Sequence, residues 1–518
     1  VSNIVIEYIM VKNSVLRTLI LIFIISILFK PTWLFNNGTL TDEVDDLSYW
    51  LHSATLAFDF DFDYSYDYQI TKDTINSETN APYHAPGSGY MSAPFVFIFS
   101  LIDLIVDNEP PDRINPVNTY SYAGYFTSTL FYSFLGFYFI KKISTNLKKN
   151  EVGLVLFITF LSTLVHFSTT RFLMAHAHEF FLVSYLVYIF EKNHCKTISA
   201  IELYKILIGF FFLSITRPST FLFSLLFFAI YKIKLSRNNL SYLKGVFFSS
   251  SLIVIYLFLA QTIYQENSIG LNLWSNNTTK GYLSDFNLDR VFEGITSMSS
   301  LFFSPSMGIV WCTPVVFFGI LVLFTNKKNN EELRRPFIFL YLFAYFLVIF
   351  VWQGNEVAYG QRLLIGLLPF LCVRILKLPN LKYFKRPLQI STVLTYLGYV
   401  YFYSSENLTL KVGENLFGNI TKWAAEDYYI YLFIELLNVE NIISVLSRTI
   451  YAVNIFKFFN FDSIANFISQ YIILEIEKVN KLERYVDSYQ AISPGYFFVV
   501  TIVIVSFSYF FQRLLRDY

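Results

Sequence analysis

Charged residues are scarce in this chain. Only 15% of its 518 residues are Asp, Glu, Lys or Arg, whereas 54% are hydrophobic and 20% are aromatic. The mean hydropathy of +0.47 is far above that of an ordinary soluble domain. This composition excludes a soluble globular enzyme, and the apolar runs that recur along the chain exclude disordered and fibrous proteins. We therefore predict an all-α polytopic membrane protein.

Cysteine, net charge and internal repeats are lacking as well. The three cysteines, Cys195, Cys312 and Cys372, are too widely spaced for a disulfide framework or a metal quartet, so we interpret them as small apolar fillers. A net charge of +1 argues against a nucleic-acid partner. No internal repeat stands out, which weakens the case for an inverted-repeat transporter.

Apolar segments of bilayer length predict about twelve transmembrane helices. Their ranges are roughly 15–35, 119–140, 152–168, 172–190, 203–216, 218–231, 245–264, 305–324, 336–352, 361–378, 387–403 and 495–512. Lys12 and Arg17 flank the first helix, which lacks a small-residue cleavage site, so we expect a retained signal anchor. The apolar segment at about 93–106 is short and carries Asp103, so we expect an interfacial helix that lies on the membrane.

The distribution of Lys and Arg predicts the orientation. With alternating helices, the inner loops hold about 24 of the 39 basic residues but only about 7 acidic ones. Both the N-terminus and the C-terminus are therefore expected in the cytoplasm. The apolar arms around Arg217 and Pro218 are short, and Lys205 must share a side with Lys232 and Lys234. We expect a hairpin with its tip outside rather than one bent helix.

The chain divides into three predicted parts. A transmembrane catalytic domain covers about 1–403 and contains a first outside loop at about 36–118. An outside helical segment follows at about 404–494, which we interpret as a lid or an acceptor-side domain. The part at about 495–518 is the final transmembrane helix and a cytoplasmic tail.

Acidic residues open the first outside loop. Asp42, Glu43, Asp45 and Asp46 directly follow the first helix, where they suit a general base, metal ligands or solvated charge.

A second acidic run in this loop has the spacing of a calcium-binding loop. Its members are Asp59, Asp61, Asp63 and Asp67. Tyr64 stands where such a loop needs glycine, and Ile70 stands where it needs an acidic residue, so the calcium interpretation is weak.

Several motifs, in this order, resemble the GT-C superfamily of polyprenyl-phosphate-dependent glycosyltransferases. They are Thr41-Asp42-Glu43, the turn His84-Ala85-Pro86-Gly87 with the short helix after it, LFFSPSMG at 301–308, TP at 313–314, WQG at 352–354, YGQRLL at 359–364 and LP at 368–369. The chain looks most like bacterial relatives of the protein O-mannosyltransferases and of the lipid A aminoarabinose transferase. The likeness covers roughly residues 15–380 of the predicted helix map. Turn chemistry alone also explains the segment around His84.

The resemblance implies an inverting transfer of a sugar from a polyprenyl-phosphate donor to an acceptor hydroxyl at the outer face. Asp42 maps onto the catalytic base, since a carboxylate can remove the acceptor's proton during attack on the anomeric carbon. The alternative is that Asp42 only caps a helix beginning at Glu43. Glu43 and His84 are expected to bind substrate, while Asp45 and Asp46 are either further polar contacts or plain surface.

Arginines are expected to stabilise the leaving phosphate. The candidates are Arg171, Arg217 and Arg362, and Arg362 is the strongest because it begins an outside helix within the family-like stretch. The alternative for Arg362 is an interfacial anchor that snorkels to lipid headgroups. Arg217 has a similar alternative as the single charge of a hairpin tip.

A polar cluster is expected at the outer ends of the third and fourth helices. It comprises His166, Arg171, His176, His178 and Glu179. Glu179 is costly in lipid and is therefore expected to face a cavity or a cation and to contribute to substrate binding. No third ligand stands near the His-x-His-Glu pattern, so a polar pocket wall is favoured over a metal site. The resemblance implies that no cofactor is required, and a divalent cation stays an alternative because the oligosaccharyltransferases of the superfamily use one.

Two other functions compete with the transferase. A polysaccharide polymerase or ligase also combines many helices with large outside loops, but it needs no acidic pair after the first helix. A lipid-linked glycan flippase or transporter is expected to carry broken helices and charge near the midplane. The resemblance further implies a bacterial plasma membrane with the site facing the periplasm, and a protein, glycan or lipid acceptor.

Overall fold

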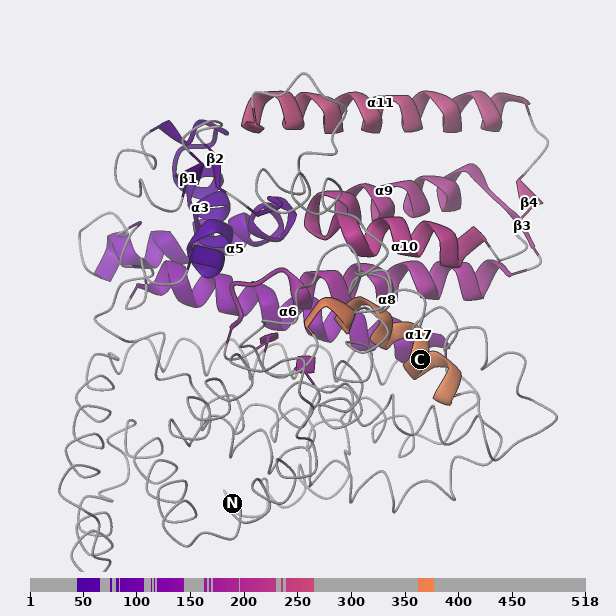
Figure 1. Ribbon diagram of the computed structural model, residues 1–518, viewed down its shortest axis with the longest axis horizontal. Coiled ribbons are helices and arrows are strands. Elements are labelled where there is room, and N and C mark those ends of the chain that lie inside the picture. Colours follow the sequence, from indigo (N-terminus) through magenta and orange to yellow (C-terminus); the bar gives the residue numbers. More distant parts are fainter. Residues whose placement is uncertain are drawn as a thin grey trace, which may run out of the picture.

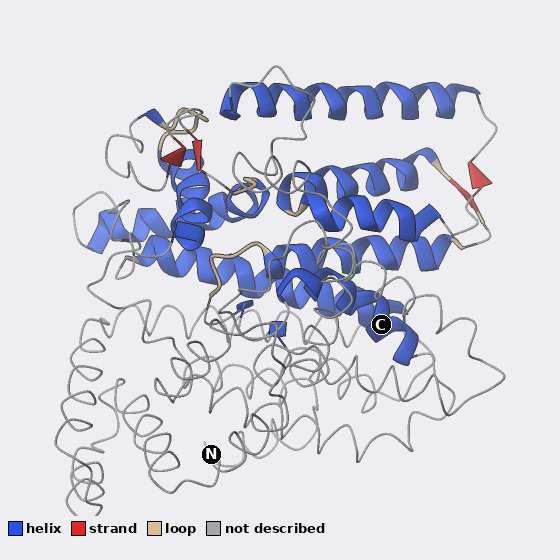
Figure 2. Cartoon of the chain, in the orientation of Figure 1, coloured by secondary structure: helices blue, strands red, loops and turns tan. Residues whose placement is uncertain are grey.

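The computed structural model describes helices over most of the chain's first half. The described residues are 44–65, 75–76, 81–82, 84–106, 113, 116, 119–143, 163–164, 167–168, 171–194, 196–229, 234–235, 239–264 and 362–376. Figure 2 shows helices throughout this part, together with short paired strands, among which β1 (Ile75–Asn76) and β2 (Ala81–Pro82) pair antiparallel. Outside it lie the predicted helices at 15–35, 305–324, 336–352, 387–403 and 495–512, most of that at 152–168, and the segment 404–494.

The described helices have the following order along the chain. They are α3 (Val44–Phe58), α5 (Gly87–Val106), α6 (Tyr120–Ile143), α8 (His176–Asn193), α9 (Ala200–Thr216), α10 (Pro218–Ala229), α11 (Asn239–Tyr264) and α17 (Leu368–Leu376), with the 3-10 helix η6 (Arg362–Leu367) directly before α17. The predicted ranges 119–140, 172–190, 203–216, 218–231 and 245–264 overlap α6, α8, α9, α10 and α11 in turn. The range 361–378 overlaps η6 and α17.

Side-chain contacts show the direction in which neighbouring helices run. Ser92 of α5 contacts Ser128 of α6, and Gly124 packs against Phe99, so α5 and α6 are antiparallel. Phe137 packs on Phe180, and Phe139 packs on both Tyr185 and Tyr188, so α6 and α8 are parallel. In Figure 1, α9 and α10 lie beside α8, and α11 lies along α9.

Helices α9 and α10 form a hairpin. Strand β3 (Thr197–Ile198), just before α9, pairs in parallel with β4 (Lys234–Leu235), just after α10. The start of α9 and the end of α10 therefore share one end of the bundle, as Figure 1 shows. Arg217, with φ −149° and ψ 82°, separates the two helices, and Pro218 opens the second, a position that suits proline. The hairpin is confirmed, and one bent helix is excluded.

Basic side chains gather at the end of the bundle opposite this tip. Lys141 and Lys142 lie in the last turn of α6, and Lys192 lies in the last turn of α8. Lys234 belongs to the strand that pairs beside the start of α9. Because α6 and α8 are parallel, the lysines of their last turns lie at the same end of the bundle.

Helix α5 is longer than the helix expected at 93–106 and takes in part of the turn expected before it. The helix begins at Gly87 and has 20 residues, including Pro94. Among the described residues, it alone is both long and apolar enough to cross a membrane. A side chain at Gly87 would stand 2.7 Å from the backbone carbonyl carbon of Ile215. The glycine that reads as a turn signal is therefore needed for a close helix contact.

Asp103 also differs from its expected role. Its side chain is buried, and its carboxylate accepts hydrogen bonds from the backbone N–H groups of Tyr120 and Ser121 at 2.6 and 2.8 Å. It thus occupies the role of an N-terminal cap for α6, supplied by a neighbouring helix. The carboxylate therefore marks a contact between α5 and α6.

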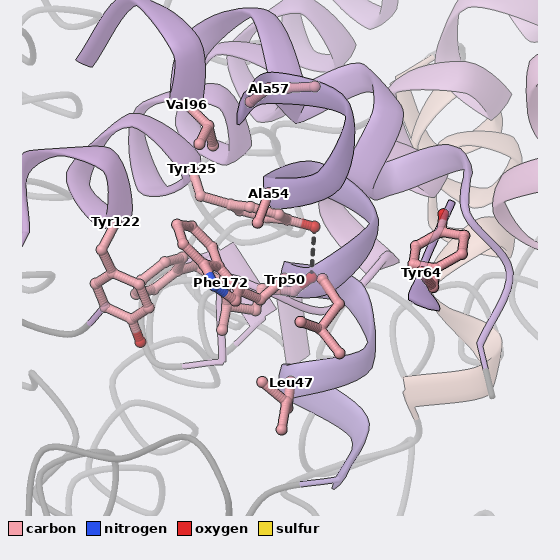
Figure 3. Close-up of a cluster of buried hydrophobic side chains, with 12 residues drawn as sticks. Leu47, Trp50, Ala54, Ala57, Tyr64, Val96, Tyr122, Tyr125 and Phe172 are labelled. Atoms are coloured by element: carbon pink, nitrogen blue, oxygen red, sulfur yellow. Dashed lines mark hydrogen bonds between the residues drawn. The ribbon is translucent and has the colours of Figure 1, made fainter. Parts of the chain in front are cut away.

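A hydrophobic cluster fastens α3 to the larger helices (Figure 3). Trp50 is completely buried there, and its ring meets Tyr122 edge-to-face with a centroid distance of 6.0 Å. The indole N–H of Trp50 donates to the carbonyl of Arg113 at 2.9 Å, and the hydroxyl of Tyr125 donates to the carbonyl of Leu173 at 2.8 Å. Each aromatic ring thus buries its apolar body while its polar atom keeps a partner.

Candidate functional site

The predicted site residues that the structure describes gather at the end of the bundle away from the lysines. This end is built by the starts of α3 and α8, the tip between α9 and α10, and η6. Asp42 and Glu43 lie outside the described residues, as does His166. Arg362 is the first residue of η6, and its side chain is outside the described part of the chain.

An ion pair joins α3 to the segment before α8. The Nε and one terminal nitrogen of Arg171 donate to Oδ2 of Asp46 at 3.0 and 2.7 Å. The Asp46 side chain is completely buried, and that of Arg171 is 14% exposed. Asp46 is therefore neither plain surface nor solvated charge. Arg171 is one of the three arginines expected at the donor phosphate. In the structure its guanidinium is instead engaged in this ion pair.

Glu179 is the centre of a second cluster. It is fully buried in the first turn of α8. His176, the first residue of this helix, has its Nδ1 3.1 Å from Oε2 of Glu179. The hydroxyl of Thr220, on α10, donates to Oε1. The Nε of Arg217 lies 3.9 Å from Oε2. A cation thus faces Glu179, and the carboxylate has hydrogen-bond donors from two helices.

Gly366 brings η6 against the same carboxylate. A Cβ at this position would stand 2.5 Å from Oε1 of Glu179 and from Cγ2 of Thr220. Any side chain here would have to displace the Glu179 carboxylate or the Thr220 methyl group. The element that begins with Arg362 is therefore packed directly on Glu179.

Arg217 and Arg171 differ in how much of their hydrogen-bonding capacity is used. Arg217 makes no side-chain hydrogen bond to any described residue, and its buried Nε lacks a hydrogen-bond partner. A guanidinium has five N–H donors in a planar fork that fits phosphate. Among the arginines whose side chains are described, Arg217 is thus the better candidate for an anionic ligand.

A histidine that the sequence analysis did not single out fixes the first loop. His52, on α3, has Nε2 2.7 Å from the carbonyl of His84 and Nδ1 2.6 Å from the hydroxyl of Tyr64. Since a carbonyl only accepts, Nε2 carries the proton and Nδ1 accepts from Tyr64. Burial lowers the pKa of His52 to about 3, so the ring is neutral. The only sequence signal for this role is a histidine within the apolar stretch of α3.

His84 lies between this contact and the tip of the hairpin. Its backbone N–H donates to the Ser48 hydroxyl at 3.0 Å, and its ring lies 4.9 Å from that of Tyr49. Three residues later, Gly87 packs directly on Thr216, the residue before Arg217. The family-like turn and the arginine tip are therefore neighbours in space.

The second acidic run forms local turns. Asp61 accepts from the backbone N–H of Asp63 at 3.0 Å, and Asp63 accepts from that of Ser65 at 2.9 Å. Asp59 pairs with Arg113. Asp67 lies outside the described residues. The bonds of Asp61 and Asp63 to backbone N–H groups two residues later are those of Asx turns at an exposed surface.

His178 belongs to a third polar contact, inside the helices. Its Nε2 lies 3.0 Å from the hydroxyl of Ser92 and 3.4 Å from that of Ser128. In the part of the chain that the structure describes, no three His, Cys, Asp or Glu side chains form a group that could hold a metal ion. His178 joins α5, α6 and α8 through hydroxyl groups.

No protein-family model and no curated protein matches this sequence.

Proposed function

We propose that this chain is an inverting membrane glycosyltransferase of the GT-C type. It would move a sugar from a polyprenyl-phosphate donor to an acceptor hydroxyl at the outer face of a bacterial plasma membrane. The observation that carries the proposal is the convergence of two family-like stretches and one candidate donor arginine at one end of the bundle. The turn at His84, the tip at Arg217 and the helix that begins at Arg362 meet around Glu179 or beside its partners.

The charges at this end fit the chemistry of such a transfer. Asp42 stands two residues before α3 in the sequence, and in the proposed reaction it removes the proton of the acceptor hydroxyl. The oxygen then attacks the anomeric carbon, and the bond from that carbon to the phosphate oxygen breaks. The leaving polyprenyl phosphate takes the bonding electrons, so its negative charge grows. Arg217 is the described guanidinium with donors left to stabilise that charge.

The opposite, lysine-rich end supports a membrane orientation. Lysines at the ends of α6 and α8 are suited to the cytoplasmic headgroups. The end with Glu179 and Arg217 would then face outward, where a polyprenyl-phosphate head is accessible. Exposed apolar side chains along α5 and α11, such as Ile105 and Phe247, suit contact with lipid.

Transfer of labelled sugar in proteoliposomes tests the proposal. A panel of polyprenyl-phosphate sugars is offered to the native chain and to Asp42→Asn, with and without a chelator. Asp61→Asn is the matched control, because Asp61 is an exposed carboxylate of the same loop.

We expect the native chain and the control to transfer sugar and Asp42→Asn to lose at least about two orders of magnitude in rate. Activity retained in chelator supports a base that works without a metal. Absence of transfer from every donor by the folded native chain contradicts the proposed function.

A further inference from the structure

Glu179 connects three stretches of the chain that are far apart in sequence. Its carboxylate contacts His176 on α8, Thr220 on α10 and the backbone around Gly366 in η6, and it faces Arg217 at the hairpin tip. With no exposed surface, this carboxylate is enclosed by the protein's own groups. Its contacts suit the orientation of neighbouring residues better than direct recognition of a sugar.

The contact between Glu179 and Arg217 orients the guanidinium. The nitrogen of Arg217 nearest the carboxylate is Nε, at 3.9 Å from Oε2. Nε is the nitrogen on the stem side of the group, so the two terminal nitrogens extend further from the stem. The one charged contact of Arg217 with a described residue is that of Nε with Glu179, so the hydrogens of the terminal nitrogens are available to a ligand. The Arg217 side chain is 17% exposed, so a ligand can reach it from outside.

The contacts of Glu179 with groups other than Arg217 keep its carboxylate from competing with an anionic ligand for the hydrogens of Arg217. Oε1 accepts the hydroxyl hydrogen of Thr220, and Oε2 lies 3.1 Å from Nδ1 of His176. Hydrogen bonds to a buried carboxylate satisfy its charge within the protein. Gly366 packs on the same carboxylate, so both of its oxygens are engaged by the protein's own groups.

We propose that Glu179 is a positioning residue that holds Arg217 for the phosphate of a polyprenyl-phosphate ligand. Its contact with Gly366 fixes η6, which carries Arg362, on the same support. This inference rests on the proposed function, because it takes the ligand class from there. It assigns Glu179 a role in phosphate affinity and none in contact with the sugar.

Binding of radiolabelled undecaprenyl phosphate to the full chain in nanodiscs tests this role without any transfer step. The variants are Glu179→Gln, Arg217→Gln and the double variant. Ser184→Ala is the matched control, because Ser184 is buried on the same helix and bonds only to the carbonyl of Phe180.

We expect each single variant to raise the Kd about tenfold, since each removes a charged contact. The control is expected to bind as the native chain does. The double variant should bind more strongly than the product of the two single effects predicts, because both substitutions disrupt one arrangement. A purely structural role of Glu179 gives two independent effects that multiply.

Three outcomes overturn the inference. If Glu179→Gln binds as the native chain does while Arg217→Gln loses affinity, the inference is contradicted and the proposed function stands. Multiplying effects in the double variant do the same. No binding by the folded native chain contradicts the proposed function itself, and the inference with it.

A second variant keeps the test decisive if Glu179→Gln does not fold. Thr220→Val removes one donor to the carboxylate and keeps both the charge and the side-chain shape. We expect a Kd a few times that of the native chain, because one hydrogen bond to a charged group is lost. An unchanged Kd in this variant contradicts the positioning role.

Discussion

Asp103, near the end of α5, accepts hydrogen bonds from both the backbone N–H and the hydroxyl of Ser121 at the start of α6. Both side chains are buried. The carboxylate compensates N–H groups that have no partner within their own helix and lies at the positive end of the helix dipole. One residue therefore fixes the connection between two antiparallel helices.

Replacement of Asp103 by Ala is expected to destabilise the protein. The change leaves the first N–H groups of α6 unpaired and should lower the free energy of unfolding by about 2 kcal/mol. Thermal unfolding in detergent measures the effect, and the exposed Asp61→Ala is the control. Equal melting temperatures for Asp103→Ala and the native chain would show that the cap does not stabilise the fold.

Loss of either partner of the ion pair between Asp46 and Arg171 should lower the free energy of unfolding as it does for a buried ion pair. Asp46→Asn or Arg171→Gln alone leaves one charge without its partner, which costs about 3–5 kcal/mol. The double variant is expected to lose less than the sum of the two, because no isolated charge remains. Denaturation of all four proteins measures the coupling.

Arg171→Lys provides a further test of the same pair. Two nitrogens of Arg171 contact one oxygen of Asp46, and a lysine cannot reproduce this fork. We expect Arg171→Lys to be less stable than the native chain although the charge is retained. Full stability in this variant contradicts a role for the fork geometry.

His52 should make the stability of the first loop depend on pH. Burial lowers its pKa to about 3 from an ordinary value of 6.5. Between these two values the unfolded chain binds a proton that the folded chain does not, so stability falls as the pH falls below about 6.5. From about pH 7 to about pH 5 the expected loss from this group is ~2 kcal/mol.

His52→Gln tests this dependence. Glutamine can keep a hydrogen bond to the His84 carbonyl but does not titrate. We expect a lower stability at neutral pH together with a flatter pH dependence, measured by thermal unfolding across this range. A pH dependence equal to that of the native chain would assign the effect to other groups.

Hydropathy and charge predict where the helices lie in the sequence, and they predict the contacts between helices less well. The short apolar arms around Arg217 and the lysines on both sides were enough to predict the hairpin, because a connection at membrane level follows from where charges can lie. The start of α5 could not be predicted, because Gly87 is a turn signal by itself and becomes a helix residue only against Thr216.

The candidate site shows the same difference. The cost of a charge in lipid predicts that Glu179 faces a cavity or a cation, and in the structure Glu179 faces Arg217. Its partners Thr220 and Gly366 carry no recognisable signal, since one is a common hydroxyl and the other a single glycine. The pairing of Asp46 with Arg171 joins residues 125 positions apart, and no local pattern predicts such a contact.

The opposite ends of the bundle should be accessible from opposite sides of a membrane. Asp61 is exposed in the first loop, and His194 is exposed just after α8, beside the lysine-rich end. In a chain whose three cysteines are replaced by serine, Asp61→Cys and His194→Cys can be labelled with a membrane-impermeant maleimide. We expect Asp61→Cys to react in intact cells and His194→Cys to react only after permeabilisation, because the lysines remain inside. Reaction of both cysteines in intact cells would exclude a membrane between these two ends, and with it the proposed donor at the outer leaflet.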